Sequence, residues 1–133
     1  MTMTELERNK TVARRYLEEV WGRGNLAVVD ELIAADYRGG TRGAGQKTHA
    51  GPDGLKQCVS GQRAAFPDGT KTLVSLTAED ERVVAEMSFA GTHAATGRRV
   101  SNDQVFVLHL RDGRIVSEAV FFDVGGTLAQ LKG

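Results

Sequence analysis

The sequence predicts an α+β domain in which three N-terminal helices pack on one face of a curved antiparallel sheet. Apolar residues recur at helical spacing through the first half of the chain, and alternating, β-branched segments fill the second half. Helices followed by a run of strands are typical of α+β folds. The 133 residues suffice for a single domain, 1–133, with a core and an internal pocket.

The first half contains three predicted helices. Apolar residues at three- and four-residue steps predict a helix over about residues 4–22, which glycines end. Asn25 can cap a second, short helix that runs to Ile33. The glycine-rich loop "GGTRGAGQKTHAG" leads to a third helix that starts at Gly51-Pro52-Asp53, because proline suits the first helical position and aspartate suits the positive end.

The second half contains four predicted strands and a short C-terminal helical turn. The expected strands cover residues 70–78, 82–91, 98–110 and 114–123. Asp112-Gly113 between the last two is a strong hairpin signal. Gly125-Gly126 ends the last strand, and "TLAQL" can form the helical turn.

Charge and composition exclude several classes of function. Lysines plus arginines number 17 and so do the acids, a balance that argues against binding nucleic acid. No apolar run is long enough to span a membrane, and the polar start of the chain is no signal segment, so we expect a cytoplasmic protein. One cysteine, Cys58, and three scattered histidines have no metal-ligand spacing, so we expect no metal site.

Several local motifs, in order, resemble the SnoaL-like polyketide cyclases of the nuclear-transport-factor-2-like superfamily. The matching stretches include "NKTVARRYLEEVWGRGNLAVVDELIAADY", "HAGPDGLKQCV", "AAFPD", "GTH", "TGRRV", "RDGRI" and "LAQL". The resemblance implies a cone-shaped fold in which the curved sheet wraps around a pocket that the helices close. It also implies a homodimer through the sheet face, and proton transfer by an acidic side chain on an apolar polycyclic substrate, with no metal or organic cofactor.

The sequence departs from the family pattern at the positions that carry this chemistry. Alignment without gaps from "TGRRV" to "LAQL" puts the family aspartate at Val120 and its histidine partner at Phe106, and a pocket asparagine falls at Gly39. The resemblance therefore leaves open two hypotheses. The chain is a cyclase, isomerase or hydrolase with a rearranged acid, or it is a non-catalytic protein that binds an apolar small molecule.

Two acids near the last strand are the candidates for a rearranged catalytic acid. Strand alternation places Glu118 on the face of Val120 and Phe122, and Asp123 on the opposite face. For Asp123 we favour a cap that accepts hydrogen bonds from the amides of Gly125 and Gly126. For Glu118 a solvated or paired acid and a catalytic acid are both open.

The remaining candidates line the expected pocket. The neighbouring strand places Asn102, Gln104, Phe106 and Leu108 on the face of Val120. Asn102 and Gln104 could hydrogen-bond a ligand, or could satisfy backbone groups. His49 and His93 match the family pattern, although a histidine near a helix start is usually a surface residue. Trp21 and Tyr16 suit the core, and the Tyr16 hydroxyl could reach the pocket because a buried phenol wants a partner.

Overall fold

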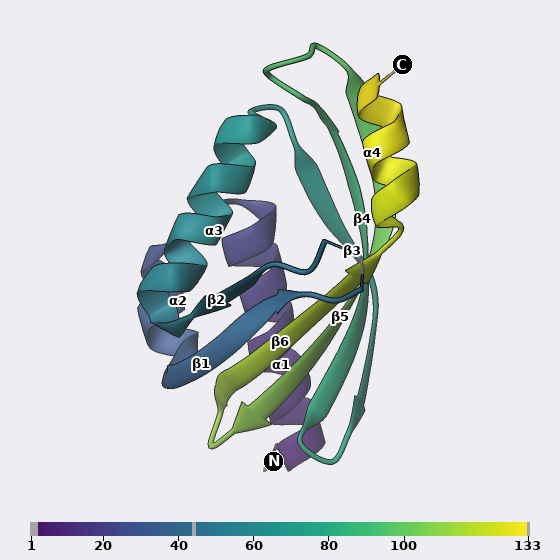
Figure 1. The fold of residues 1–133 in the computed structure, drawn as a ribbon. Helices are drawn as coiled ribbons and strands as arrows, with labels where there is room; N and C mark the ends of the chain where they lie inside the picture. The colour runs from purple at the N-terminus through teal and green to yellow at the C-terminus, as the bar shows by residue number, and fades with distance from the viewer. Residues whose placement is uncertain (1–2, 44, 133) are drawn as a thin grey trace.

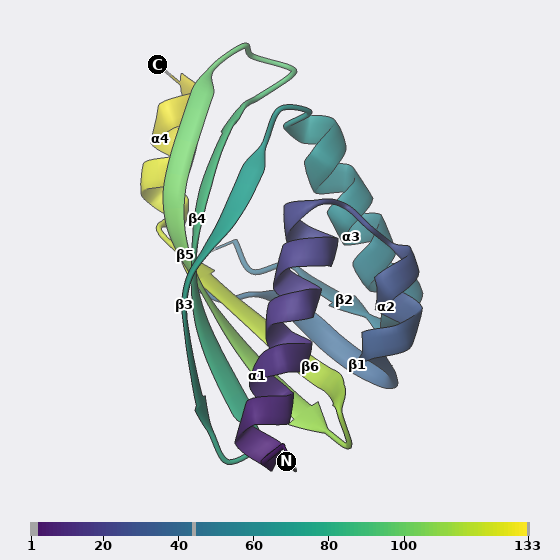
Figure 2. The ribbon, with the colours of Figure 1, turned by 180° about the vertical axis from the view of Figure 1, so that it is seen from behind.

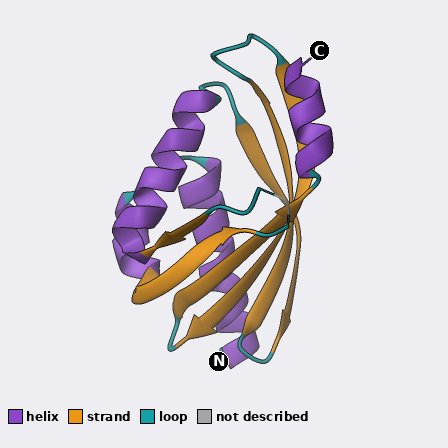
Figure 3. Cartoon of the chain, in the orientation of Figure 1, coloured by secondary structure: helices purple, strands orange, loops and turns teal. Residues whose placement is uncertain are grey.

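One sheet of six strands organises the chain, which the computed structural model describes over residues 3–43 and 45–132. The helical elements are α1 (Glu5–Tyr16), the π-helical η1 (Leu17–Gly22), α2 (Ala27–Leu32), α3 (Gly51–Ala65) and α4 (Val124–Lys132). The strands are β1 (Ile33–Thr41), β2 (Thr48–Ala50), β3 (Thr70–Glu79), β4 (Arg82–Thr92), β5 (Arg99–Arg111) and β6 (Arg114–Phe122). They lie in the order β2-β1-β6-β5-β4-β3; Figure 1 labels them, and Figure 3 sets strands apart from helices by colour.

The N-terminal helices cover one face of the strongly curved sheet. Figures 1 and 2 show α1, α2 and α3 on the same side of the sheet, with α4 beside the start of β5. The core lies between these helices and the sheet, and its largest fully buried side chains include Tyr16, Tyr37, Phe106, Leu55 and Met87. The predicted α+β fold class is thereby confirmed.

The first predicted helix is confirmed over its whole length, although its last turn is wider than expected. Thr4 and Glu7 form a reciprocal capping box at the start of α1. The chain then passes into the π-helical η1. In a π-helix residues five apart hydrogen-bond through the backbone, so Trp21 comes close to Tyr16. This spacing matters for the site described below.

The four predicted strands are confirmed to within two residues at each end. The turn between β5 and β6 has positive φ at both Asp112 (52°) and Gly113 (77°), as expected for a tight hairpin turn. The expected helical turn "TLAQL" is part of a longer helix, α4. Its Gln130 side chain exchanges two hydrogen bonds with the Ser101 backbone, alongside β5 and beyond the end of β6.

The expectation of a loop over residues 39–51 was wrong, and two further strands in this segment extend the predicted antiparallel sheet. Ile33, predicted to end the second helix, begins β1, which reaches Thr41, and Thr48–Ala50 form β2. β1 pairs with β6 in parallel, so the sheet is mixed. Its glycines have low strand propensity, so the sequence does not predict β1. Burial of Ile33 and Tyr37 and pairing with the distant β6 stabilise this strand.

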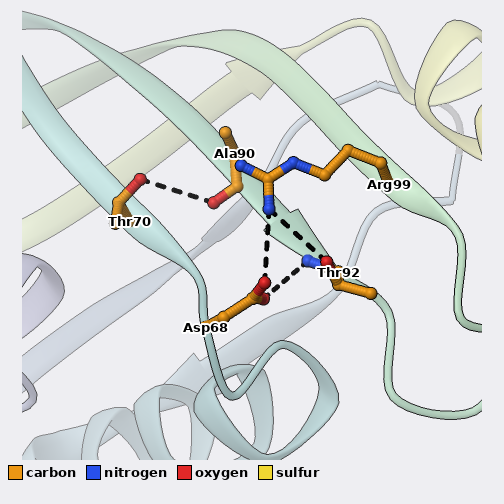
Figure 4. Close-up of polar contacts among 5 residues, drawn as sticks. All are labelled: Asp68, Thr70, Ala90, Thr92 and Arg99. Carbon is orange, nitrogen blue, oxygen red and sulfur yellow. Dashed lines mark hydrogen bonds and ion pairs between the residues drawn. The ribbon is translucent and has the colours of Figure 1, made fainter.

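Asp68 ties the end of α3 to the hairpin between β4 and β5 (Figure 4). Its carboxylate accepts from the Thr92 amide at 2.6 Å and from the Arg99 guanidinium at 3.2 Å. These contacts lower the pKa of Asp68, the Thr92 amide being the main cause. Near them Thr70 reaches the Ala90 carbonyl, which holds β3 beside β4. Within the described residues no helix is long and apolar enough to cross a membrane.

Candidate functional site

A cavity of about 700 Å³ opens between the sheet, α3 and the start of α4. The residues that line it come from almost every element, because the curved sheet brings them to one concave surface. Of the residues predicted from sequence, it is lined by Trp21, His49, Gln104, Phe106, Glu118, Val120 and Phe122. Phe106 and Val120, which stand where the family pattern has polar groups, lie directly opposite each other on β5 and β6.

Glu118 is the acid at the centre of this wall. It is only 3% exposed, yet its side chain accepts three hydrogen bonds. The Tyr16 hydroxyl donates to Oε1 at 2.7 Å and the Trp21 indole at 3.1 Å, while the Tyr37 hydroxyl donates to Oε2 at 2.7 Å. An ionised carboxylate only accepts, so it matches three donors. The sequence left Glu118 open between a solvated or paired acid and a catalytic one, and the structure shows a buried, hydrogen-bonded acid.

The donors come from three separate elements. Tyr16 ends α1, Trp21 lies in η1 and Tyr37 lies on β1, next to β6. The indole N–H of Trp21 is shared, since it also lies 2.8 Å from the Tyr16 oxygen. The π-helical turn thus lets both side chains reach one carboxylate oxygen.

Tyr37 connects Glu118 to His49, which lines the cavity. The Tyr37 oxygen is 2.9 Å from His49 Nε2, and the two rings lie 5.5 Å apart. Tyr37 has one proton and gives it to Glu118, so we assign the Nε2 proton of His49 to the hydrogen bond with Tyr37. Nδ1 of the imidazole is then its proton acceptor.

Burial sets the protonation of this chain of groups. Burial, with the charge of Glu118 as a second cause, raises the pKa of both Tyr16 and Tyr37, which stay protonated donors. Burial lowers the pKa of His49, and the charge of Glu118 opposes this shift. A histidine with a lowered pKa is neutral at neutral pH, so the ring can take up a proton.

Gly39 makes the Tyr37–His49 contact possible. A Cβ at this position would overlap the Tyr37 hydroxyl and lie 2.9 Å from His49 Nε2. The absence of a side chain here therefore has a steric reason. At Gly39, where the family pattern has an asparagine, the phenol of Tyr37 occupies the space that a side chain would need.

Three further polar groups face the same cavity. Lys71 on β3 lines it with its amine 4.1 Å from the centroid of the Trp21 ring, and burial lowers the pKa of this amine to about 8. Cys58 on α3 also lines it, and burial raises the pKa of the thiol. The carbonyl oxygen Oε1 of Gln104 is buried without a hydrogen-bond partner among the described residues.

Four of the predicted pocket residues lie outside the described lining. Tyr16 and Leu108 are fully buried in the core, although Tyr16 reaches the site through Glu118. Asn102 is occupied by hydrogen bonds to Thr127 and Gln104. His93 packs on Phe66 and contacts the Thr96 hydroxyl in the hairpin after β4.

Asp123 lies in the position of a helix cap. Its side chain is exposed and accepts from the Gly126 amide at 2.9 Å, at the start of α4. Of the two amides predicted to donate to this cap, those of Gly125 and Gly126, the Gly126 amide makes the hydrogen bond. The position of Asp123 outside the cavity lining gives it no contact with the Glu118 group.

Tyr37 and Lys71 are among the residues of this site that are missing from the sequence-based candidates. Lys71 is two residues from the apolar Leu73 on β3, so both side chains lie on the same face of the strand, and this spacing indicates that Lys71 points inward. Tyr37 precedes the glycines of β1, and the sequence gives no sign that this segment is a strand. No group of three or more His, Cys, Asp or Glu side chains in the described ranges gathers in a way that could hold a metal ion.

Solved structures similar to this chain share its whole fold. A candidate polyketide cyclase from Acidithiobacillus ferrooxidans is 25% identical, with 98% of each chain covered and a TM-score of 0.81. IdmH, a candidate polyketide cyclase from Streptomyces antibioticus, is also 25% identical, with 94% of this chain and 99% of that one covered and a TM-score of 0.79. A candidate SnoaL-like polyketide cyclase from Jannaschia sp. CCS1, at 17% identity, 100% and 98% coverage and a TM-score of 0.88, supports the fold alone.

The family assignment rests on sequence as well as on fold. A search of curated protein sequences gave no significant match. The SnoaL-like polyketide cyclase profile, in contrast, matches residues 11–131, which is most of the chain. The sequence motifs, the mixed sheet and this match agree, and the chain belongs to the SnoaL-like polyketide cyclase family.

Proposed function

We propose that this chain is an acid–base catalyst that removes a proton next to a carbonyl group of a flat, apolar small molecule, as a cyclase or isomerase does. One observation carries the proposal: a buried carboxylate, Glu118, is linked through Tyr37 to a neutral histidine, His49, in the wall of a cavity. General acid–base catalysis requires a proton acceptor positioned in this way.

The groups of the chain have different roles in this proposal. His49 accepts the proton, because the lowered pKa of its ring keeps it neutral. Glu118 and Tyr37 orient the ring and stabilise the imidazolium that forms, and they are positioning residues. Gln57 and Gln62 line the same cavity, and their amide N–H groups are suitable donors for an oxygen on which charge develops.

The cavity supports an apolar ligand of moderate size. Its volume of about 700 Å³ lies within the range of small-molecule sites. Phe106, Val120 and Phe122 give it flat and branched apolar walls. The relationship to candidate polyketide cyclases supports a polyketide-like substrate.

One specific observation favours a second function, that of a non-catalytic binding protein for an apolar small molecule. The positions of the family aspartate and histidine are Val120 and Phe106, and both lie in the cavity wall. If no other group acts as the base, the site binds its ligand without changing it.

Hydrogen–deuterium exchange at the α-carbon of 2-tetralone, a flat apolar ketone, distinguishes the two functions. NMR in D₂O would compare the wild type with His49→Gln and with Asp123→Asn, which keeps a capping side chain. We expect the wild type to accelerate exchange by about 10²–10⁴ over buffer, because general base catalysis is of this size. His49→Gln should lose most of this rate and Asp123→Asn should keep it.

The contrary result is equally clear. If the wild type exchanges 2-tetralone no faster than the same concentration of imidazole, the acid–base proposal is wrong. Quenching of the fluorescence of Trp21, the only tryptophan, would then show whether the cavity binds the ketone. Binding without exchange would establish the non-catalytic function.

A further inference from the structure

Lys71 presents an amine to the aromatic wall of the cavity. It lies at the start of β3 and is partly buried. Its Nζ is 4.1 Å from the centroid of the Trp21 ring, 5.4 Å from that of Phe106 and 5.9 Å from that of Phe89. Neither the acid–base proposal nor the fold requires an amine at this place.

The surroundings of Lys71 differ from those of Lys56, which is also ordered by side-chain contacts. Lys56 forms an ion pair with Asp30 at 2.8 Å, and this contact raises the pKa of its amine. No carboxylate of the described residues lies within 4.0 Å of the Lys71 amine, which faces aromatic rings instead. A lysine without an ion-pair partner in an apolar cavity is a candidate nucleophile.

We propose that Lys71 is a carbonyl-reactive amine, which forms an imine with an aldehyde or ketone group of an aromatic ligand in this cavity. Such a covalent step goes beyond the proton transfer proposed above and does not depend on it. Trp21 and Phe106, whose rings meet edge to face beside the amine, form an aromatic corner against which an aromatic ligand can pack near Nζ.

The step needs no oxidant or reductant. The neutral amine attacks the carbonyl carbon, a C–N bond forms, and the carbonyl oxygen takes up a proton as the nitrogen gives one up. The C–O bond of this carbinolamine then breaks, the oxygen leaves as water, and the nitrogen loses its last proton to give the imine.

The protonation of Lys71 supports this chemistry. Burial lowers the pKa of the amine to about 8, against the charge of Glu118 on β6. His49 on β2 and Lys47, just before β2, also face the cavity. At pH 8 about half of the Lys71 amines are therefore neutral, compared with less than about 1% of ordinary lysines.

Reductive trapping tests the proposal on the wild-type protein. 2-Naphthaldehyde is an aromatic aldehyde without α-protons, and sodium cyanoborohydride converts any imine into a stable amine. Peptide mapping by mass spectrometry then compares Lys71 with Lys10, Lys47, Lys56 and Lys132 in the same sample. We expect labelling of Lys71 to be at least about tenfold faster than labelling of Lys56 at pH 8, because more of its amine is neutral.

The variant Lys71→Arg completes the test. Arginine keeps a positive charge and a long side chain but forms no such imine, so the fast labelling should disappear while circular dichroism shows an intact fold. The fast labelling of Lys71 should persist in His49→Gln, because the imine does not require the base at His49. Labelling spread over all five lysines according to their exposure, or unchanged in Lys71→Arg, would overturn the imine proposal alone.

Discussion

The phenol of Tyr37 passes over the backbone of Gly39, and its hydroxyl lies where a side chain at Gly39 would begin. This relationship lets one hydroxyl contact both Glu118, at 2.7 Å, and His49, at 2.9 Å. The backbone of Gly39 is not in the left-handed region, so glycine is needed here for space and not for conformation. The site therefore depends on the absence of a single methyl group.

The first prediction is that Gly39→Ala disrupts the hydrogen bonds of Tyr37. The new Cβ would displace the hydroxyl, leaving buried Glu118 without one donor, at a cost of about 1–3 kcal/mol in the free energy of unfolding. The exchange of 2-tetralone should fall as well. Gly61→Ala on α3 is the matched control, because a Cβ there meets no atom within 4 Å, and it should leave stability unchanged or raised. Equal behaviour of the two variants in urea unfolding would contradict this account.

The second prediction separates the two tyrosines on Glu118. Tyr37→Phe and Tyr16→Phe each remove one donor, so both should lower the free energy of unfolding by about 1–3 kcal/mol. Only Tyr37 contacts His49, so the rate of 2-tetralone exchange should fall further in Tyr37→Phe. A larger loss of rate in Tyr16→Phe would show that His49 does not act through Tyr37.

The local pattern of the last two strands was enough to predict one wall of the site. Alternation is a property of each strand alone, and it put Glu118, Val120 and Phe122 on one face, where the structure has them in the cavity lining. Alternation tells which face of the sheet a residue is on, but not whether the residue reaches the cavity or lies deeper in the core. Leu108, directly opposite Glu118, shares its face but lies in the core and not in the cavity lining.

The other wall depends on contacts between distant segments. Tyr37 joins the site because β1 pairs with β6, which lies about 80 residues later and leaves no local pattern. Tyr16 and Trp21 are five residues apart, a spacing that places them on different sides of an α-helix, and only the π-helical turn brings them together. Sequence periodicity assumes regular α and β geometry, so it could not predict this cluster.

The third prediction concerns the titration of His49 when the charge of Glu118 is removed. That charge raises the pKa of His49 against the effect of burial, so Glu118→Gln should lower the pKa of His49 further. NMR titration of the imidazole resonances measures the change. Asp123→Asn removes an exposed carboxylate outside the cavity lining and should leave the His49 midpoint in place. An unchanged midpoint in Glu118→Gln would mean that the two groups are not electrostatically coupled.

The fourth prediction is that the chain forms a homodimer through the sheet face that the helices leave uncovered. Val84, Val105 and Phe121 on this face are 38%, 39% and 46% exposed, and Val105 lies directly opposite Phe121 on neighbouring strands. Exposed apolar surface of this kind favours association. We expect light scattering to give twice the chain mass of 14.3 kDa.

Phe121→Asp should convert this dimer into a monomer, because a charge in an apolar interface is costly. Leu6→Asp is the control: Leu6 is similarly exposed, at 43%, but lies on α1, away from the sheet face. It should leave the mass unchanged. A wild type that scatters as a monomer at micromolar concentration would remove the proposed interface.

The fifth prediction uses the stability of the chain to test the environment of Lys71. The pKa of its amine is about 8 in the folded chain and about 10.4 when unfolded, so the unfolded chain binds more protons between these values. The free energy of unfolding should therefore rise with pH from about 8 to 10, relative to Lys71→Met, by up to about 1.4 kcal/mol per pH unit. Below pH 8 the buried ammonium lowers the stability of the folded chain, so Lys71→Met should be the more stable protein.

Lys56→Met should show no such rise in the free energy of unfolding, because the ion pair with Asp30 raises the pKa of Lys56. Urea unfolding at pH 7, 8, 9 and 10 measures both differences, and a Lys71→Met difference that stays constant over this range would show that the amine is well solvated and has no special reactivity.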